Sequence, residues 1–476
     1  MSNFSSRHER EEMHELLRAY NNLRMGRSHP FIEEESFERI IDYFDDKEDL
    51  PAAIEAAENG IHQYPYSSAL LLKKADLQIA SRKYSDALET LASAEVFDST
   101  NITLYILKTD AFLALDMHDD AVQVLQTALD QFEGDERIEL LFQLADVYDD
   151  YEDFQKVFDC LKWVLEDDPI NEEALMKICF WADFTGRSEE SIVLHQKILE
   201  DYPFNELAWF NLATAFQGLK LYEKAIDAYL YALAIDEKFD IAYRNMADAY
   251  IRIRRFKDAI EALEKVLELS RPEEVIHEAI GHCYHKMNNF AQARFHYRKA
   301  SHLNPEDSKL HYKIALTYFK ENQLESTIKQ LDAAMNIHRM QPEYNLLMGE
   351  CKLEQGKIKD AVIYFSNVVR VRPKNASGWE ALIRCLVKAE YYEEAAEQTL
   401  NAMEATSGKP LFQYYHSAIL FAVGKSKEGL LQLEKALQLN TKLLKKFIEL
   451  QPQMLHNPSV VDLIMRYKGK KPKKGS

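Results

Sequence analysis

The chain has 476 residues with 78 acidic and 58 basic side chains, a formal net charge of −20, and only 14 glycines and 13 prolines. The scarcity of glycine and proline argues against a many-stranded β fold and favours helices joined by short turns. The sequence contains no run of about 18 apolar residues, so we expect no membrane-spanning helix. Its first residues lack the apolar core of a secretory signal, so we expect no such signal.

The cysteines indicate a reducing compartment. They are Cys160, Cys179, Cys283, Cys351 and Cys385. Their number is odd, they are widely spaced, and they never form a Cys-x-x-Cys pair. This usage is typical of reduced thiols rather than of a disulfide framework. We therefore expect a cytoplasmic protein.

Charge is distributed unevenly along the chain. Acidic side chains outnumber basic ones by about three to one in residues 31–200, whereas residues 201–476 are slightly basic. Phosphate binding requires clustered cations. Nucleic acid is therefore an unlikely partner of the acidic half.

Residues 1–33 are the first predicted segment. Met13, Leu16 and Tyr20 recur at helical spacing, which predicts an amphipathic helix over residues 8–25. We expect this helix to cap the array that follows, because the ends of a stacked array need a polar outer face. The alternative is a segment that detaches and binds a partner.

From residue 34 the sequence repeats with a period of 34 residues. One series of small residues comprises Ala53, Ala87, Ala121, Ala225, Ala259, Ala293, Ala361 and Ala395. A small side chain at a fixed place lets two helix axes approach, and large neighbours fill the space beside it. Such a helix pair buries its apolar face only against the next pair, so the period predicts twelve stacked pairs over residues 34–443.

The pattern is clearest between residues 206 and 340. The large and small side chains that define one repeat there are Trp209, Leu212, Ala213, Phe216, Ala225, Tyr229 and Ala232. This pattern resembles the tetratricopeptide repeat. The resemblance implies an all-α fold, a right-handed α-solenoid of stacked antiparallel helix pairs. It also implies that the first helix of each pair lines a concave groove that binds partner proteins.

The C-terminal part is predicted to close the array. Residues 444–467 are expected to form capping helices, with Asn457 as N-cap and Pro458 in the first helical position. Residues 468–476 contain five lysines and no apolar side chain, which predicts a disordered tail. An alternative function assigns this tail to tethering the protein to an anionic membrane or to nucleic acid.

The sequence lacks a recognisable catalytic framework. It has no glycine-rich phosphate loop, no zinc-protease motif and no nucleophile elbow. The nearest approach to a metal motif is the set His277, His282, Cys283 and His285. His282 and His285 share a helix face, but Cys283 points elsewhere, so we interpret these residues as structural or as partner contacts. We predict no enzymatic activity, no cofactor and no metal site.

In the family that the chain resembles, the second, fifth, ninth and twelfth places of each repeat tend to face the groove. In the early repeats these places hold an acidic wall, namely Asp42, Asp45, Asp76, Asp110, Asp146, Asp149 and Asp183. A row of carboxylates would attract a basic partner. The competing interpretation is local pairing with lysines such as Lys73.

The middle repeats differ at the same places. Their central groove set is Phe210, Thr214, Gln217, Arg244, Asp248, His282, His285, Lys309, Tyr312 and Phe319. Aromatic rings beside cations suit an extended peptide or a helix, with the rings as anchors. Core packing is the competing interpretation for Phe210 and Phe319.

A chaperone-binding carboxylate clamp, known in some members of this family, is not expected. Asn211 and Asn245 fit its asparagine places, but Phe210 stands where the first lysine should be. The sequence therefore predicts a non-enzymatic scaffold that binds peptide or helical segments of other proteins. It leaves the identity of the partners and the oligomeric state open.

Overall fold

The computed structural model describes residues 2–27 and 31–468, and within them the regular structure is entirely helical. The chain divides into two compact units, Met1–Ala249 and Tyr250–Ser476. The period of the sequence gives no sign of this division. The lysine-rich tail predicted over residues 468–476 lies, apart from its first residue, outside the described residues.

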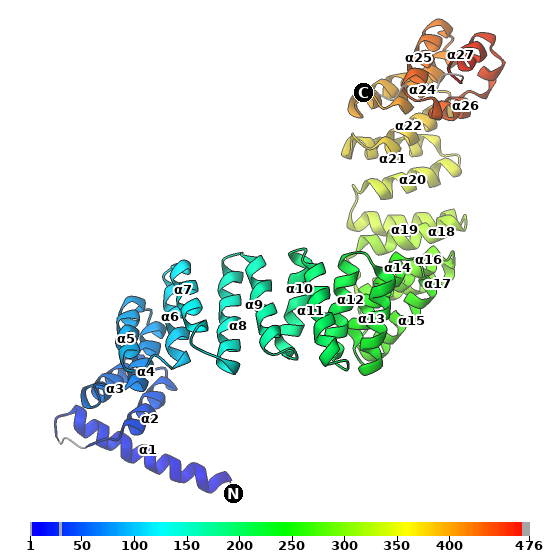
Figure 1. Ribbon diagram of the computed structural model, residues 1–476. Helices are drawn as coiled ribbons and strands as arrows, with labels where there is room; N and C mark the ends of the chain where they lie inside the picture. The colour runs from blue at the N-terminus through cyan, green and yellow to red at the C-terminus, as the bar shows by residue number, and fades with distance from the viewer. Residues whose placement is uncertain (1, 28–30, 469–476) are drawn as a thin grey trace. The chain divides into compact units, whose positions relative to one another are not determined.

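The helices follow one another in pairs (Figure 1). The first unit contains α1 (Ser2–Arg24), α2 (Glu34–Asp45), α3 (Leu50–Gln63), α4 (Ser68–Ala80), α5 (Tyr84–Phe97), α6 (Ile102–Ala114), α7 (His118–Leu129), α8 (Gly134–Asp150), α9 (Phe154–Asp167), α10 (Glu172–Phe184), α11 (Ser188–Asp201), α12 (Glu206–Gly218) and α13 (Tyr222–Ile235). Helix α14 (Asp240–Arg252) contains the boundary between the units.

The second unit continues the pattern. Its helices are α15 (Phe256–Leu269), α16 (Glu274–Lys286), α17 (Phe290–Leu303), α18 (Ser308–Lys320), α19 (Leu324–Ile337), α20 (Pro342–Glu354), α21 (Ile358–Val371), α22 (Ala376–Lys388), α23 (Tyr392–Ala405), α24 (Pro410–Ala422), α25 (Ser426–Leu439), α26 (Leu444–Leu450) and α27 (Pro458–Lys468). Two short 3-10 turns, Thr441–Leu443 and Pro452–His456, flank α26. The even-numbered helices α2 to α24 are the first helices of the pairs, and the odd-numbered helices α3 to α25 are the second helices.

Polar caps and tight turns fix where these helices begin and end. Asn205 accepts a hydrogen bond from the Ala208 N–H at 2.8 Å, which starts α12. The same capping at 3.0 Å by Asn171 starts α10. Between the two helices of a pair the chain reverses through a residue with positive φ, for example Lys220 at 62° and Gly356 at 74°. The chain thus forms antiparallel pairs joined by very short turns.

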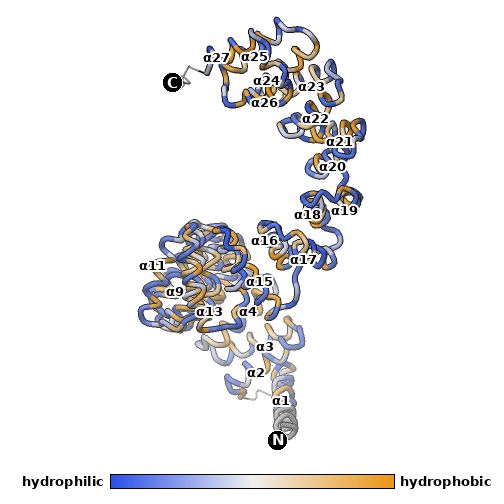
Figure 2. The backbone as a smooth tube through the Cα atoms, turned by 90° about the vertical axis from the view of Figure 1, so that its right-hand side faces the viewer, coloured by the Kyte–Doolittle hydropathy of each residue, from blue (hydrophilic) through white to orange (hydrophobic). Residues whose placement is uncertain are grey.

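The recurring small residues lie at the helix joints, as predicted. All eight alanines of the series are completely buried. The facing place in the first helices is also tight. At Gly349 of α20, an added Cβ would lie 2.5 Å from a ring carbon of Phe365. Hydrophobic residues accordingly recur in every pair along each unit (Figure 2). The fold is the predicted all-α solenoid of stacked antiparallel helix pairs.

Successive first helices contact one another, as α4 does with α6 in the first unit and α20 does with α22 in the second. Each second helix packs between first helices, as α5 does between α4 and α6. The first helices therefore form a continuous face in each unit, which we call the first-helix face. Side chains that point away from the joints on this face are available to a partner.

Additional helices pack against both ends of the array. Tyr20 of α1 is buried among Phe37, Ile40 and Ala53 of the first pair. At the other end, Phe447 of α26 belongs to a core cluster with side chains of α24, α25 and α27. Among the described residues, no helix is both long and apolar enough to cross a membrane.

The five cysteines are free thiols. Cys160, Cys283, Cys351 and Cys385 are buried, and Cys179 is partly buried. Burial raises the pKa of the Cys160 thiol to about 12, which keeps it protonated and unreactive at neutral pH. These cysteines therefore act as small packing residues.

Candidate interaction surfaces

The acidic wall lies on the first helices of the first unit, and all seven of its aspartates are exposed. Partial burial raises the pKa of the Asp76 carboxyl, and the carboxylate of Asp45 raises it further. Partial burial and then Asp76 likewise raise the pKa of Asp110. Carboxylates on α2, α4 and α6 are therefore close enough to repel one another. Lys73 pairs with Asp42, as the competing interpretation expected for that residue.

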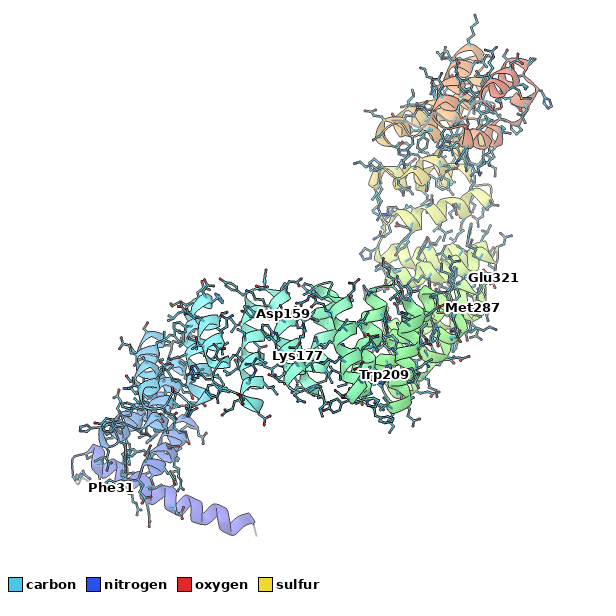
Figure 3. The ribbon with its side chains drawn as sticks, in the orientation of Figure 1. Phe31, Asp159, Lys177, Trp209, Met287 and Glu321 are labelled. Carbon is cyan, nitrogen blue, oxygen red and sulfur yellow. The ribbon has the colours of Figure 1, made fainter. Side chains whose placement is uncertain are left out.

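The wall becomes mixed in charge between α8 and α10. Asp146 has a raised pKa, caused first by partial burial, while the nearby Lys177 acts in the opposite direction. Lys177, labelled in Figure 3, pairs with Glu173 at 2.6 Å and lies over the Phe142 ring at 5.2 Å. Glu173 and the Phe142 ring therefore fix the Lys177 side chain. Its single positive charge leaves most of the negative charge of the wall uncompensated.

Helix α10 carries exposed aromatic residues that the sequence analysis missed. Phe180 and Phe184 are 60% and 59% exposed, and their stacked rings lie 5.8 Å apart. Trp181 stacks on Phe154 at 5.4 Å, and Phe154 meets Phe184 edge to face at 5.0 Å. We call these four residues the α10 aromatic cluster. An exposed cluster of this kind is typical of an interaction site.

A signal for this cluster was present in the sequence. Phe180 occupies the ninth place of its repeat, which holds aspartate in each of the four preceding repeats. Met176, Phe180 and Phe184 follow one another at intervals of four residues, which places them on one face of the helix. Met176 is itself 56% exposed and extends the apolar surface.

Phe210 is not an exposed anchor, and this prediction of the central groove set was wrong. The side chain is only 8% exposed. Its ring lies 4.9 Å from Phe239, which follows α13, and 5.8 Å from Tyr229. The ring is buried because Phe239, in the connection between α13 and α14, covers it, so core packing, the competing interpretation, applies.

Other members of the set near Phe210 take part in a hydrogen-bond network. Tyr229 Oη lies 3.3 Å from Thr214 Oγ1 and donates to Gln217 Oε1 at 3.2 Å. Gln217 Nε2 in turn donates to Asp248 Oδ2 at 3.2 Å. These groups join α12, α13 and α14. Arg244, on α14, is partly buried.

Asn211, which fits an asparagine place of the carboxylate clamp, points into the interior. Its side chain is buried, and Nδ2 donates to the Leu175 carbonyl at 2.7 Å. The same Nδ2 lies 3.2 Å from His195 Nε2, while His195 Nδ1 lies 2.7 Å from the Ser191 carbonyl. These contacts fit a neutral imidazole, because burial lowers the pKa of His195 to about 4. The Asn211 side chain therefore forms its hydrogen bonds inside the protein.

In the second unit, four residues of the central groove set meet at one cavity of about 690 Å³. They are His282, His285, Lys309 and Tyr312. We call this cavity the groove pocket. It is bounded by residues of α16, α18 and α20, and its remaining walls include Tyr344, Leu316, Lys286, Lys313, Glu343 and Arg372.

The groove pocket combines aromatic walls with cations. The rings of Tyr312 and Tyr344 lie 5.0 Å apart, and Tyr344 Oη lies 3.0 Å from Ser308 Oγ. Burial lowers the pKa of His282 and of His285, so both imidazoles are neutral at pH 7. The positive charge of the pocket is therefore carried by its lysines and arginine.

Some of these cations already have partners. Lys313 pairs with Glu278, and Arg372 pairs with Glu343 at 2.7 Å. Lys286 and Lys309 are exposed, and no ion pair involves either of them within the described part of the chain. Glu306 and Asp307 also line the groove pocket and form no ion pair among the described residues, so its unmatched charges are of both signs.

Phe319, the last member of the set, lies at a different cavity. It packs partly against the core around Tyr344 and Met348. It also lines a cavity of about 590 Å³ together with Glu350 and Arg384. Four of the five second-unit residues of the set thus line one cavity and Phe319 lines another, and their role as partner contacts stays a prediction.

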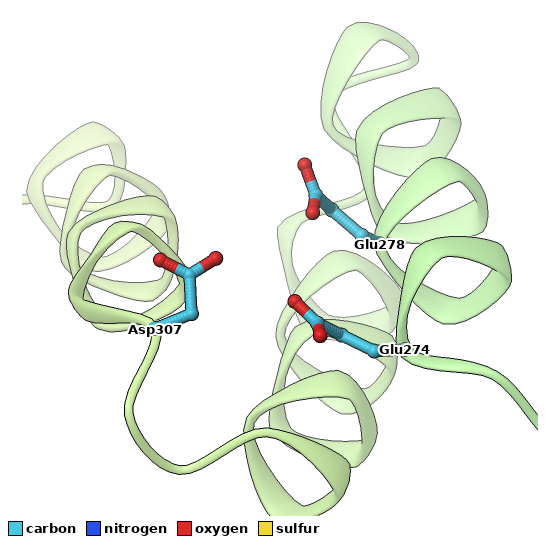
Figure 4. Close-up of side chains that lie close together, drawn as sticks. All are labelled: Glu274, Glu278 and Asp307. Atoms are coloured by element: carbon cyan, nitrogen blue, oxygen red, sulfur yellow. The ribbon is translucent and has the colours of Figure 1, made fainter. Parts of the chain in front are cut away.

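In the described ranges, one group of side chains is spaced closely enough to hold a metal ion, namely Glu274, Glu278 and Asp307 (Figure 4). Each carboxylate already has a partner in the protein. Glu274 accepts from Asn304 Nδ2 at 2.7 Å, and Asp307 accepts from the Lys309 N–H at 2.8 Å. Glu278 pairs with Lys313. We therefore assign these acids a structural role.

The fold and the positions of the exposed residues define a class of protein, the α-solenoid built from helical repeats. A family model described as the tetratricopeptide repeat protein 21 C-terminal ARM domain matches residues 187–350. A tetratricopeptide repeat model matches residues 346–410. The chain is a tetratricopeptide-type repeat protein, as its repeat pattern predicted. No curated protein matches its sequence.

Solved structures of repeat proteins resemble parts or most of the chain. The C-terminal part of a tetratricopeptide repeat-containing protein from Cytophaga hutchinsonii is 14% identical, with a TM-score of 0.43, covering 54% of this chain and 99% of that one. The APC/C hetero-tetramer Cut9-Hcn1 is 11% identical, with a TM-score of 0.35 and coverages of 92% and 96%. YrrB, described as a TPR protein with an unusual peptide-binding site, is 18% identical, with a TM-score of 0.35 and coverages of 39% and 96%.

Proposed function

We propose that this protein is a non-enzymatic scaffold that binds peptide or helical segments of other proteins on its first-helix faces. The observation that carries the proposal is the groove pocket, where His282, His285, Lys309 and Tyr312 line one cavity on the first helices of the second unit. Its volume of about 690 Å³ lies in the range of ligand-binding pockets.

The chemistry of the groove pocket favours a segment with an apolar or aromatic side chain beside polar or charged groups. Tyr312 and Tyr344 offer ring faces that remove apolar surface from water. Lys286 and Lys309 form no ion pair within the described residues and can meet a carboxylate of the ligand, while Glu306 can meet a cation. The neutral imidazoles of His282 and His285 add hydrogen-bonding groups without adding charge.

The first unit supports a second kind of partner for the same scaffold. The acidic wall on α2, α4, α6 and α8 leads along the chain to the α10 aromatic cluster. Carboxylates next to exposed rings suit a basic segment with apolar side chains, since the charges orient the segment and the rings anchor it. We propose that the first unit binds such segments. The acidic character of this unit also speaks against nucleic acid as its partner.

We also propose the extent of the repeat array and the cellular location of the protein. We assign residues 34–443 to twelve repeats, residues 1–33 to an N-terminal cap and residues 444–467 to C-terminal capping helices. The five free cysteines support a cytoplasmic location. Tethering through the lysine-rich tail is the alternative function, and deletion of residues 468–476 tests it.

Affinity capture with mass spectrometry tests the scaffold function. The native chain is compared with the double variant Tyr312→Ala/Lys309→Glu and with Lys329→Glu, a control at an exposed lysine on the second helix α19. We expect the double variant to lose at least one protein that the native chain and the control both capture. Identical sets of captured proteins for all three chains would contradict a role for the groove pocket.

A further inference from the structure

A second cavity of the second unit lies outside the first-helix face. It has a volume of about 730 Å³ and is bounded by α17, by Tyr318 near the end of α18 and by Pro272 before α16. It shares no lining residue with the groove pocket. We call it the outer cavity. Its position on a second helix means that a ligand there need not compete with a segment on the first-helix face.

The outer cavity is lined by cations and, among the described residues, by no acidic side chain. The basic side chains of α17 that line the cavity are Arg294, Arg298, Lys299 and His302. Arg294 is neutralised by Glu321, labelled in Figure 3, at 2.7 Å. Arg298 and Lys299 are exposed, and no ion pair involves either of them in the part of the chain that the structure describes. Two uncompensated positive charges therefore face the cavity.

These cations are held in place by aromatic rings. Arg298 donates to the hydroxyl of Tyr318, and Lys299 Nζ lies 4.6 Å from the centre of the Phe295 ring. The guanidinium of Arg294 lies over the Tyr318 ring at 4.5 Å. Contacts of this kind restrict the long side chains before a ligand arrives, which lowers the entropic cost of binding.

Two buried histidines at the cavity, of which His277 lines it, add no charge at neutral pH. His277 and His296 are both buried, with their Nδ1 atoms 3.3 Å apart. Burial is the main cause of the lowered pKa of each, and His277 and Lys299 also lower that of His296, to about 4. Arg298 and Lys299 therefore carry the net charge of the cavity.

Apolar side chains accompany the cations along the same helix. Phe295 and Leu303 line the cavity and are 50% and 47% exposed. The lining of α17 from Arg294 to His302 spans nine residues, or about 12 Å of helix. Arg298 and Lys299 are neighbours near the middle of this length, with Phe295 before them and Leu303 after them. Charge flanked by apolar groups along one helix suits an elongated ligand that carries both kinds of group better than inorganic phosphate, which has no apolar part.

We propose that the outer cavity binds an acidic peptide segment that carries apolar side chains. Carboxylates of the segment meet Arg298 and Lys299, and an apolar side chain packs against Phe295 and Leu303. The site is independent of the groove pocket, so the scaffold can hold an acidic segment on α17 while a different segment occupies a first-helix face.

Fluorescence anisotropy with the full-length protein tests this proposal. The probe is a fluorescein-labelled peptide of about twelve residues with alternating glutamate and leucine or phenylalanine. We expect Arg298→Glu/Lys299→Glu to weaken binding by about tenfold or more, because two attractive contacts become repulsive. The matched control Lys329→Glu/Lys359→Glu reverses two exposed lysines on the second helices α19 and α21 and should weaken binding by less than about twofold.

Further measurements separate the apolar contribution from the charged one and test other ligands. Phe295→Ala, at a half-exposed residue that should leave the helical circular dichroism unchanged, is expected to weaken binding several-fold, as is a probe with alanine in place of its apolar residues. Tyr312→Ala in the groove pocket should leave binding of the probe unchanged. The proposal is overturned if the charge-reversal variant binds like the native chain or if its control loses as much affinity. Displacement of the probe by millimolar inorganic phosphate, or binding of phosphatidylserine vesicles in its place, would also overturn it.

Discussion

The two units of this protein use the same helix pairs to present different chemistry. In the first unit the ninth places of successive repeats hold Asp42, Asp76, Asp110 and Asp146, whereas in the second unit corresponding surfaces hold imidazoles, lysines and tyrosines. The buried places hardly differ, since alanine occupies the same joint in α13 and in α21. The comparison shows that the joints determine the scaffold and leave the exposed places free to specify partners.

The strongest test of a common scaffold removes the large ring that packs against the small joint. Tyr229 in the first unit and Phe365 in the second occupy equivalent places and are both buried. We expect Tyr229→Ala and Phe365→Ala each to lower the free energy of unfolding by about 3–5 kcal/mol. Urea denaturation followed by circular dichroism measures the effect. Leu230→Ala and Ile363→Ala, at exposed neighbours, should change it by less than about 0.5 kcal/mol.

The equivalent place in α11 holds a histidine, which makes the first unit sensitive to acid. His195 is fully buried, and its pKa of about 4 lies below the ordinary value of 6.5. Between these two pH values the unfolded chain binds more protons than the folded chain, so stability falls as pH falls. We expect His195 to remove about 2 kcal/mol between pH 7 and pH 5.

Urea midpoints at the two pH values check this prediction. His195→Gln cannot titrate, so the difference between its two midpoints should be smaller than that of the native chain. His62→Gln, at an exposed histidine of the same unit, should retain the native difference. Equal differences in all three proteins would show that His195 does not control the acid sensitivity.

The acidic wall should account for most of the affinity of the first unit for basic segments. We expect the variant with Asp42, Asp76, Asp110 and Asp146 changed to asparagine to bind a lysine-rich amphipathic peptide about tenfold more weakly than the native chain, with a reduced dependence on salt. The control changes four second-helix aspartates to asparagine, namely Asp86, Asp119, Asp227 and Asp258. Equal weakening in both variants would show that the peptide responds to the net charge of the protein and not to the acidic wall.

The smallest expected effect concerns a charged pair at the edge of the groove pocket. Arg372 and Glu343 are about half exposed and lie 2.7 Å apart. Exposed ion pairs contribute little to folding, so Arg372→Ala should change the free energy of unfolding by at most about 0.5 kcal/mol. Thermal or urea denaturation gives this value. A loss above about 2 kcal/mol would mean that the charges of the pocket serve the fold rather than a ligand.

The period of small residues made the fold predictable, because each repeat places small side chains where two helices meet, and at Gly349 the Phe365 ring leaves no room even for a Cβ. The exposed places were harder to predict. The register of Phe210 predicted an exposed side chain, but Phe239, in the connection between α13 and α14, covers its ring. The α10 aromatic cluster was missed because Asp183 assigned its repeat to the acidic wall, although the ninth place of that repeat changes from aspartate to Phe180. Period alone also gives no sign of the boundary between the two units.

Photocrosslinking on the full-length protein tests the central claim most directly. Two photoreactive peptides of equal length and equal apolar content are compared, one rich in lysine and one rich in glutamate, and their attachment sites are mapped by mass spectrometry. We predict that the lysine-rich peptide attaches to the first helices α4 to α10 and that the glutamate-rich peptide attaches to α16, α17 and α18. Attachment of both peptides to the same helices, or of the lysine-rich peptide mainly to second helices, would contradict the account.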